Sequence, residues 1–239
     1  MILAILQARM SSTRLPGKVL RPLAGAPMIL RQIERVRRSR QVGRLVVAIS
    51  EDRTDDVLKD ILEGAGAEVF RGPLEDVLAR YAGCLEAKGP AEHVVRLTAD
   101  CPFLDWQVMD AVIERHLETG ADYTANTFGR RTFPKGLDVD IVTSGVLIEA
   151  ATQATDPYER EHVLPFIYRR PERYRLQGFE QSRDEGDLRW TVDLPEDLDF
   201  ASQVYDALYP ENPAFTPDDV RALLSTRPDL ANLGGYRRI

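Results

Sequence analysis

The length, composition and charge of the chain exclude several classes of protein. Its 239 residues, 44% of them hydrophobic and 29% charged, are enough to bury one sizeable core. Two cysteines, Cys84 and Cys101, are too few for a disulfide scaffold, and three histidines without a cysteine cluster argue against a structural zinc site. A net charge of −7 argues against nucleic acid as a partner, although it leaves room for a local basic pocket.

The apolar segments are too short for secretion or membrane insertion. No run approaches the ~20 apolar residues that span a bilayer. The opening run, 1–6, has no basic stretch before it and is shorter than the apolar part of a signal peptide. We therefore expect a cytoplasmic protein without a membrane partner.

The first half of the chain alternates between predicted strands and predicted helices. Apolar runs predict buried strands at 1–6, 45–49, 68–70 and 93–97. Apolar residues at helical spacing predict helices after Pro27 and over 54–62, 74–85 and 105–118. This alternation predicts an α/β fold with a parallel sheet and helices on both faces. In such folds, ligands bind beyond the carboxyl ends of the strands.

The second half of the chain is less regular. Strands are predicted at 138–142 and 188–192. Helices are predicted over 145–154 and 158–164, and two more begin at Pro195 and Thr216. Pro165 should end or kink the helix that precedes it.

Two further features have ordinary structural explanations. The arginines between 31 and 40 predict a solvated face on the helix that follows Pro27. Cys101 has no histidine placed to activate it in the sequence, and a small buried thiol is the simpler interpretation.

The segment from Gln7 to Lys18 carries the strongest chemical signal. It contains the cations Arg9, Arg14 and Lys18, three hydroxyl side chains and Gly17, but no acid. Backbone N–H groups, hydroxyls, arginine forks and a lysine charge are what polyphosphate binding requires. A solvated basic loop is the alternative, and the position of the segment directly after the first buried strand favours phosphate binding.

Two aspartates occupy similar positions in the predicted sheet. Asp100 and Asp193 each follow a predicted strand and lie two residues before a proline. Alone, each is typical of a turn or a helix N-cap. Facing a phosphate-binding loop together, they predict a magnesium site, because Mg²⁺ binds through one or two carboxylates and the phosphates of its substrate.

At this point the sequence resembles a known family. Ala8-Arg9 and the run from Ser12 to Lys18 resemble the signature of the 3-deoxy-manno-octulosonate and acylneuraminate cytidylyltransferases. Across its whole length the chain is most similar to the spore coat polysaccharide biosynthesis protein F group within that superfamily. Four later segments carry this narrower resemblance, at 96–102, 133–140, 160–163 and 190–193.

The resemblance implies a fold and a reaction. It implies one domain with a three-layer Rossmann-like nucleotidyltransferase fold, a mostly parallel sheet and a small inserted lobe at about 125–180. That lobe would complete the acceptor site and make a homodimer. The implied reaction transfers CMP from CTP to a sugar or sugar acid and releases pyrophosphate, for surface polysaccharide or glycan synthesis.

The resemblance also implies roles for individual residues. Arg9, Lys18 and Asp100 match catalytic residues, and Asp100 and Asp193 match the two magnesium carboxylates. The implied nucleotide-binding residues are Gln7, Ala8, Arg9, Ser12, Arg14, Gly17, Lys18 and Thr98. The candidate acceptor-binding residues are Lys135, Asp138, Asp140, Glu161 and His162, for which a turn entering a strand and an exposed helix face are the alternatives.

One departure from the family pattern affects the choice of base. The better-known cytidylyltransferases have a glutamine close to the base at the position of Thr98. Nucleotidyl transfer is therefore a firmer expectation than cytosine specificity, and the sequence does not name the sugar.

Three other functions compete with CMP transfer. A nucleotidyltransferase could use another nucleoside triphosphate or a sugar 1-phosphate. A glycosyltransferase of similar architecture could use Asp138-Val139-Asp140 as its metal motif, although that motif lies inside a predicted strand. A subunit that binds nucleotide without reaction is the third alternative, and the presence of Arg9, Lys18, Asp100 and Asp193 together argues against it.

Overall fold

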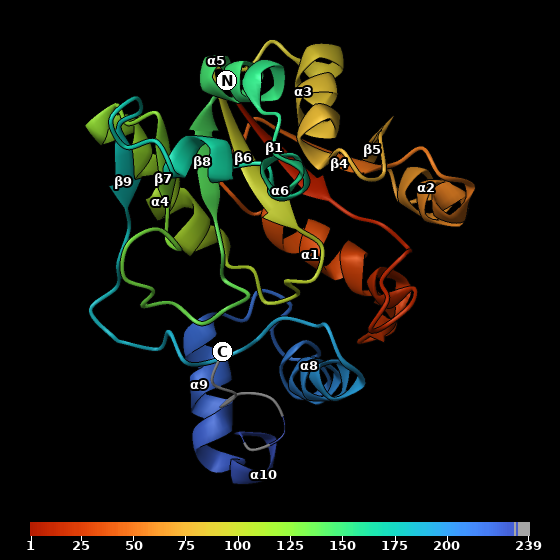
Figure 1. Cartoon of the computed structure of the whole chain (residues 1–239). Helices are drawn as coiled ribbons and strands as arrows, with labels where there is room; N and C mark the ends of the chain where they lie inside the picture. The colour runs from red at the N-terminus through yellow and green to blue at the C-terminus, as the bar shows by residue number, and fades with distance from the viewer. Residues whose placement is uncertain (232, 234–239) are drawn as a thin grey trace.

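The computed structural model describes residues 1–231 and 233, and its centre is a sheet of seven strands (Figure 1). Across the sheet the strand order is β5-β4-β1-β6-β8-β7-β9. In that order the strands are β5 (Glu68–Gly72), β4 (Arg44–Ser50), β1 (Ile2–Gln7), β6 (His93–Thr98), β8 (Asp140–Thr143), β7 (Tyr123–Ala125) and β9 (Leu176–Gly178).

Strand β8 runs against the other strands of this sheet. Strands β5, β4, β1 and β6 pair in parallel, with Gln7 opposite Thr98 where β1 and β6 end. Strand β8 pairs antiparallel with β6 and with β7, and β7 pairs in parallel with β9. Asp140, at the start of β8, therefore pairs with Arg96 near the carboxyl end of β6.

Helices cover both faces of the sheet because the strand residues alternate between two cores. Ile2, Ala4 and Leu6 pack toward α1 (Met28–Val36), α2 (Asp56–Gly64) and α4 (Trp106–Thr119). Leu3 and Ile5 point to the other face, which is covered by α3 (Val77–Lys88), α5 (Ser144–Gln153), α6 (Pro157–His162) and α7 (Pro165–Tyr168). Strands buried on both faces explain the continuous apolar runs of the sequence.

A third apolar core lies below the sheet in the view of Figure 1. Here α8 (Pro195–Leu208), α9 (Pro217–Thr226) and α10 (Pro228–Leu230) pack around aromatic side chains that include Phe103 and Trp190. Leu23 joins them from a small hairpin, β2 (Pro22–Leu23) and β3 (Ala26–Pro27). The short 3₁₀ helices η1 (Lys18–Leu20) and η2 (Arg53–Asp55) complete the helices and strands.

Most predicted elements are confirmed, and one predicted strand is wrong. Residues 188–192 form no strand of the sheet and make only an isolated bridge between Lys135 and Arg189. The apolar residues that suggested a strand instead bury Trp190 and Val192 in the third core. Pro165 does end one helix and begin the next, as expected.

The prediction of a solvated arginine face on α1 is wrong for Arg35. Arg35 is 2% exposed, and it donates hydrogen bonds to the carbonyls of Leu104 and Phe215 at 2.6 and 3.0 Å. Its position on the buried side of the helix, between Ile33 and Val36, explains why it is not solvated.

Residues 125–180 add the inner strand β8 and the edge strand β9 to the main sheet, and add α5 to α7 to one face. Dimerisation and acceptor binding by this segment stay predictions.

None of the helices in residues 1–231 and 233 combines the length and apolarity needed to cross a membrane.

Candidate active site

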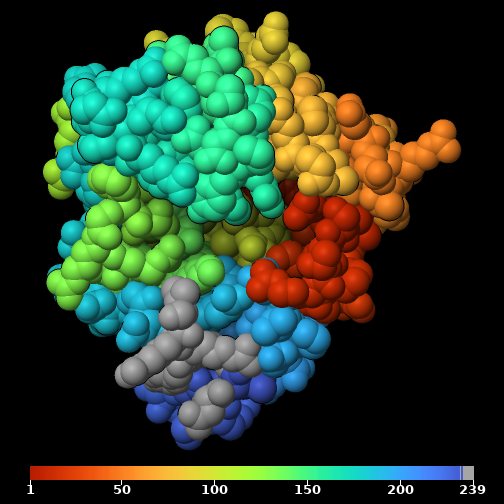
Figure 2. All heavy atoms as spheres, viewed as in Figure 1, coloured from red at the N-terminus to blue at the C-terminus, as the bar shows by residue number. Residues whose placement is uncertain are grey.

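Two adjoining cavities open at the carboxyl ends of the central strands. The first has a volume of about 340 Å³ and the second of about 450 Å³. Figure 2 shows the hollow between the N-terminal loop in red and the green and cyan segments, with residues near 100 in its floor. The residues that line both cavities are Arg14, Arg96, Thr98, Asp100, His162 and Asp193.

The predicted nucleotide-binding residues line the first cavity, except Gly17. Gln7, Ala8 and Thr98 come from strand ends, and Arg9, Ser12, Arg14 and Lys18 come from the N-terminal loop. Of the predicted acceptor-binding residues, Lys135, Asp138 and Asp140 line the second cavity, Glu161 lines the first, and His162 lines both.

The N-terminal loop is closed on itself and pinned at its start. The carbonyl of Met10 accepts hydrogen bonds from the N–H groups of Ser12 and Gly17, at 2.8 and 3.1 Å. Gly17 has a φ of 66°, which favours glycine at this position. The N–H of Met10 donates to the buried carboxylate of Asp55 at 2.7 Å. Both ends of the loop are therefore fixed by hydrogen bonds, and its cations are held at the rim of the first cavity.

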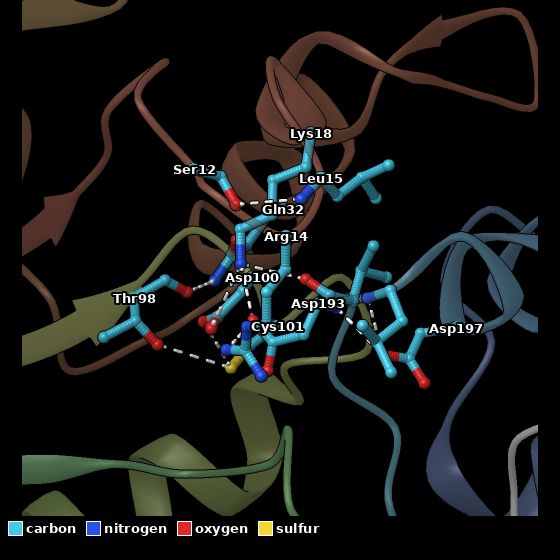
Figure 3. A network of polar contacts seen from close by, with 12 residues as sticks. Ser12, Arg14, Leu15, Lys18, Gln32, Thr98, Asp100, Cys101, Asp193 and Asp197 are labelled. Carbon is cyan, nitrogen blue, oxygen red and sulfur yellow. Dashed lines mark hydrogen bonds and ion pairs between the residues drawn. The ribbon is translucent and has the colours of Figure 1, made fainter.

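Lys18 is the centre of the ionic network (Figure 3). Its Nζ donates to the Val192 carbonyl and to Asp193 Oδ1, both at 2.9 Å, and lies 3.5 Å from Asp100 Oδ2. The two aspartates thus converge on one cation although they are far apart in the sequence. The prediction that both face the basic loop is confirmed.

The side chain of Asp193 pairs with cations and does not cap the helix that follows it. Besides Lys18, it pairs with Arg14 at 3.0 Å and Arg189 at 2.5 Å. Burial acts to raise the pKa of Asp193, but the hydrogen bond and charge of Lys18 and the two arginines outweigh it and lower that pKa. Asp197 caps α8 by accepting from the N–H groups of Asp193 and Leu194. The Asp193 side chain is therefore left to face the cavity.

Asp138 and Asp140 are each neutralised by an arginine in the second cavity. Asp138 accepts two hydrogen bonds from Arg131, at 2.7 and 3.2 Å. Asp140 accepts from Arg96 at 3.1 Å and from the hydroxyl of Tyr123 at 2.7 Å. The strand begins at Asp140, so the expectation that both aspartates lie inside it is wrong. These pairings give no support to a metal site at Asp138-Val139-Asp140.

Several residues of the site escaped sequence analysis. Arg96, Arg131 and Arg189 pair with its aspartates, and Arg80 lines the first cavity from α3. Asp55 also escaped notice as the residue that holds the N-terminal loop. Arg96 lies in the segment 96–102, but sequence analysis assigned none of these residues a role in the site, because their role depends on contacts between distant segments. Cys101 is buried, as expected, and burial raises its pKa.

The donor set fits a magnesium ion that is shared with a bound phosphate. Within residues 1–231 and 233, no three His, Cys, Asp or Glu side chains are grouped to hold a metal by themselves. Asp100 and Asp193 nevertheless already share one cationic group, the ammonium of Lys18. Two carboxylates with the remaining ligands from phosphate and water are a usual magnesium environment.

The mostly parallel sheet, with a basic loop after its first strand and two carboxylates opposite, defines a nucleotidyltransferase fold. The chain belongs to the cytidylyltransferase family, whose model matches residues 3–216. The resemblance drawn from the sequence motifs is thereby confirmed.

Similar proteins agree with this assignment. The spore coat polysaccharide biosynthesis protein SpsF of Bacillus subtilis (strain 168) is 36% identical over 96% of both chains. The solved structure of a cytidylyltransferase from Leptospira borgpetersenii is 29% identical, with a TM-score of 0.89 over 96% of this chain and 95% of that one. The structure of CMP:2-keto-3-deoxy-manno-octonic acid synthetase complexed with CTP has a TM-score of 0.65 at 17% identity. It covers 88% of this chain and 99% of that one, and it shows the shared fold.

Proposed function

We propose that this protein transfers CMP from CTP to a hydroxyl group of a sugar or sugar acid. The observation that carries the proposal is the convergence of Lys18, Asp100 and Asp193 between two adjoining cavities. One cavity offers the cations that a triphosphate requires, and the other offers paired charges and tyrosine hydroxyls that suit a polyhydroxylated acceptor.

In the proposed reaction, the acceptor hydroxyl oxygen attacks the α-phosphorus of CTP. The bond between that phosphorus and the oxygen bridging to the β-phosphate breaks, and pyrophosphate leaves. The hydroxyl proton passes to solvent. Arg9, Arg14 and Lys18 stabilise the charge on the phosphate oxygens, which is the main task in this type of transfer.

Magnesium would be held by Asp100 and Asp193 together with the phosphates. When bound, it supplies positive charge that polarises a phosphoryl oxygen. In the structure, Lys18 bridges these two carboxylates and so keeps them close together. The guanidinium of Arg14 is exposed and can exchange its ion pair with Asp193 for a contact with a phosphate. Asp193 then retains its ion pair with Arg189.

The proposal is tested by measuring pyrophosphate release with CTP, UTP, TTP, ATP and GTP across a panel of sugars and sugar acids. We expect magnesium-dependent turnover with CTP and at least one acceptor. A folded sample that turns over with none of these pairs contradicts CMP transfer. Turnover with a different nucleotide, or only with a sugar 1-phosphate, establishes the first alternative instead.

We further propose a homodimer in which residues 125–180 contribute to the contact between subunits. This proposal rests on the family resemblance. Sedimentation equilibrium at micromolar concentration measures the mass, and a particle of 26.9 kDa rather than twice that mass contradicts it.

A further inference from the structure

The ammonium group of Lys18 lies between the two carboxylates that we assign to magnesium. Its Nζ atom is 2.9 Å from Asp193 Oδ1 and 3.5 Å from Asp100 Oδ2. Figure 3 shows both aspartates at the end of this side chain. A magnesium ion bound to Asp193 Oδ1 at about 2.1 Å would lie within about 5 Å of Nζ. The ion and the ammonium group would therefore compete for the same oxygen atoms and repel each other.

Lys18 is firmly held in this position. Its Nζ atom also donates to the Val192 carbonyl at 2.9 Å. An ammonium group has three donors, and the carbonyl and the two carboxylates provide one partner for each. The side chain is 13% exposed, and the backbone N–H donates to the Leu15 carbonyl within the closed N-terminal loop. The ammonium group therefore stays between the carboxylates unless another ligand offers it new acceptors.

The other cations around Asp193 do not bridge the two carboxylates. Arg14 contacts Asp193 Oδ1 at 3.0 Å, and Arg189 contacts Oδ2 at 2.5 Å. Within residues 1–231 and 233, Lys18 is the one cation that forms an ion pair with both Asp100 and Asp193. Arg189 holds the oxygen atom of Asp193 that Lys18 does not contact. Loss of the Lys18 contact would therefore leave Asp193 anchored through Arg189.

The first cavity would offer Lys18 other partners when a polyphosphate binds in it. Lys18 lines this cavity together with Arg9 and Arg14. Phosphate oxygen atoms bound by these arginines would be acceptors for the ammonium group. When Lys18 turns toward them, Asp100 and Asp193 lose the cation that they share. A divalent ion coordinated by the same phosphates can then replace it.

We propose that Lys18 keeps divalent metal ions away from Asp100 and Asp193 until a polyphosphate draws its ammonium group away. Lys18 serves first as the counter-ion of the carboxylates and then as a ligand of the phosphates. Phosphate binding and metal binding are thereby coupled, and each raises the affinity for the other by the same factor. The inference rests on the proposed function, from which the metal-binding role of the two aspartates is taken. It adds an order of events, because the metal enters with the nucleotide or after it.

The test measures metal binding without a nucleotide. Mn²⁺ is the probe, because it binds the same kind of oxygen ligand as magnesium and the electron paramagnetic resonance signal of the free ion can be measured. Lys18→Met keeps both carboxylates but lacks the ammonium group between them. We expect this variant to bind Mn²⁺ about tenfold more tightly than the wild-type protein, or better. An unchanged or weaker affinity would overturn the inference.

Two controls separate this role from a general effect of charge. Arg14→Met removes an equal charge that contacts Asp193 alone, so it should strengthen Mn²⁺ binding by less than about threefold. A gain equal to that of Lys18→Met would overturn the inference, because any nearby cation would then oppose the metal. Adding Asp100→Asn to Lys18→Met should abolish the gain. A gain that persists places the ion elsewhere and contradicts the inference.

A second substitution covers the case in which Lys18→Met does not fold. Lys18→Gln keeps a hydrogen-bond donor for the Val192 carbonyl but carries no charge. It should show the same gain in Mn²⁺ affinity, and a folded sample without that gain overturns the inference as well. The melting temperature of each variant shows whether it is folded.

The outcome is separable from that of the proposed function. The binding measurement contains neither nucleotide nor acceptor, so a protein that releases no pyrophosphate from CTP can still show the gain. Conversely, a protein that transfers CMP while Lys18→Met shows no gain keeps the proposed function and contradicts this inference alone.

Discussion

Lys18 shows how one side chain connects the binding of phosphate to the placement of two carboxylates. It pairs with both Asp100 and Asp193, and its side chain is only 13% exposed. A charge placed in such a partly buried position acts more strongly than one in water, because the surrounding dielectric is lower. Lys18 is also positioned by the Val192 carbonyl, which fixes its ammonium without neutralising it.

Replacing Lys18 with methionine should reduce pyrophosphate release at least 100-fold. The substitution removes a charge that we expect to stabilise the transition state, and losing one such donor costs about 10²–10³-fold in rate. Arg21→Met is the matched control, because Arg21 is an exposed cation three residues away. The measurement is the steady-state rate with CTP and the best acceptor. Equal rates for wild type and Lys18→Met contradict the assigned role.

At the scale of helices and strands, hydrogen bonds of buried polar side chains fix the relative positions of elements. Apolar contacts alone would fix these positions less precisely. Arg35 ties α1 to the segment before α4 and to the segment before α9, through the carbonyls of Leu104 and Phe215. His93 of β6 contacts His116 of α4 at 3.0 Å, and His116 contacts Thr124 of β7 at 2.9 Å. Each link is sensitive to a change in charge because it is shielded from water.

Arg35→Ala should lower the free energy of unfolding by about 3 kcal/mol. The change removes the donor to two buried carbonyls and the cation 3.9 Å from the buried Asp105, and uncompensated buried polar groups account for losses of this size. Arg40 is exposed and lies just beyond the same helix. Arg40→Ala should therefore change the free energy of unfolding by less than about 0.5 kcal/mol. Urea denaturation measures both, and similar values for the two variants would contradict the structural role of Arg35.

Stability should fall as the pH is lowered from about 6.5 to about 4. Burial, with a smaller contribution from the charge of His93, lowers the pKa of His116 from 6.5 to about 4. Between these pH values the unfolded chain binds a proton that the folded chain does not, so unfolding becomes easier as the pH falls. The expected loss across the window is on the order of 3 kcal/mol.

The measurement is the free energy of unfolding from urea titrations at several pH values. His116→Gln lacks the titrating ring, so its stability should depend less steeply on pH across the same window. A variant that keeps the full slope would show that other groups cause it.

For the molecule as a whole, the candidate active site joins segments from both ends of the chain. The N-terminal loop supplies the cations, and the segment before α8 supplies Asp193, which lies 175 positions from Lys18. Several cations there surround a small number of carboxylates, while the chain as a whole carries a net charge of −7. A small polyanion therefore finds a local basic site on a protein that repels long polyanions.

CTP should raise the melting temperature of the protein by several degrees. At a concentration 100 times the dissociation constant, a ligand that binds only the folded state adds about 2.7 kcal/mol. For a chain of this length, that corresponds to a shift of about 5–10 °C. Differential scanning fluorimetry with CTP and magnesium measures it, and cytidine alone is the control for binding without phosphates. An unchanged melting temperature at millimolar CTP contradicts nucleotide binding.

The sequence was sufficient for the parts of the fold that depend on local patterns. The four parallel strands and the helices between them follow from apolar runs and helical spacing, and the basic loop follows from its composition. Strands β7 and β9 have three residues each, which is too short for a periodic pattern. The segment 188–192 looked like a strand because a buried loop and a buried strand have similar composition.

The candidate site was predictable only where a motif marked it. Lys18, Asp100 and Asp193 belong to motifs, and the structure brings them together. Arg80 and Arg131 belong to none, and each reaches the cavities through the packing of a distant element. The antiparallel direction of β8 also had no local signal, although it places Asp140 beside Arg96.

The contact between Lys18 and Asp193 has a consequence for the protein during its synthesis. The ribosome releases residues 1–98, with the four parallel strands, well before it adds the segment that carries Asp193. A nascent chain can thus form much of its sheet while its candidate active site still lacks the carboxylate of Asp193. Turnover of CTP should begin only when translation is nearly complete.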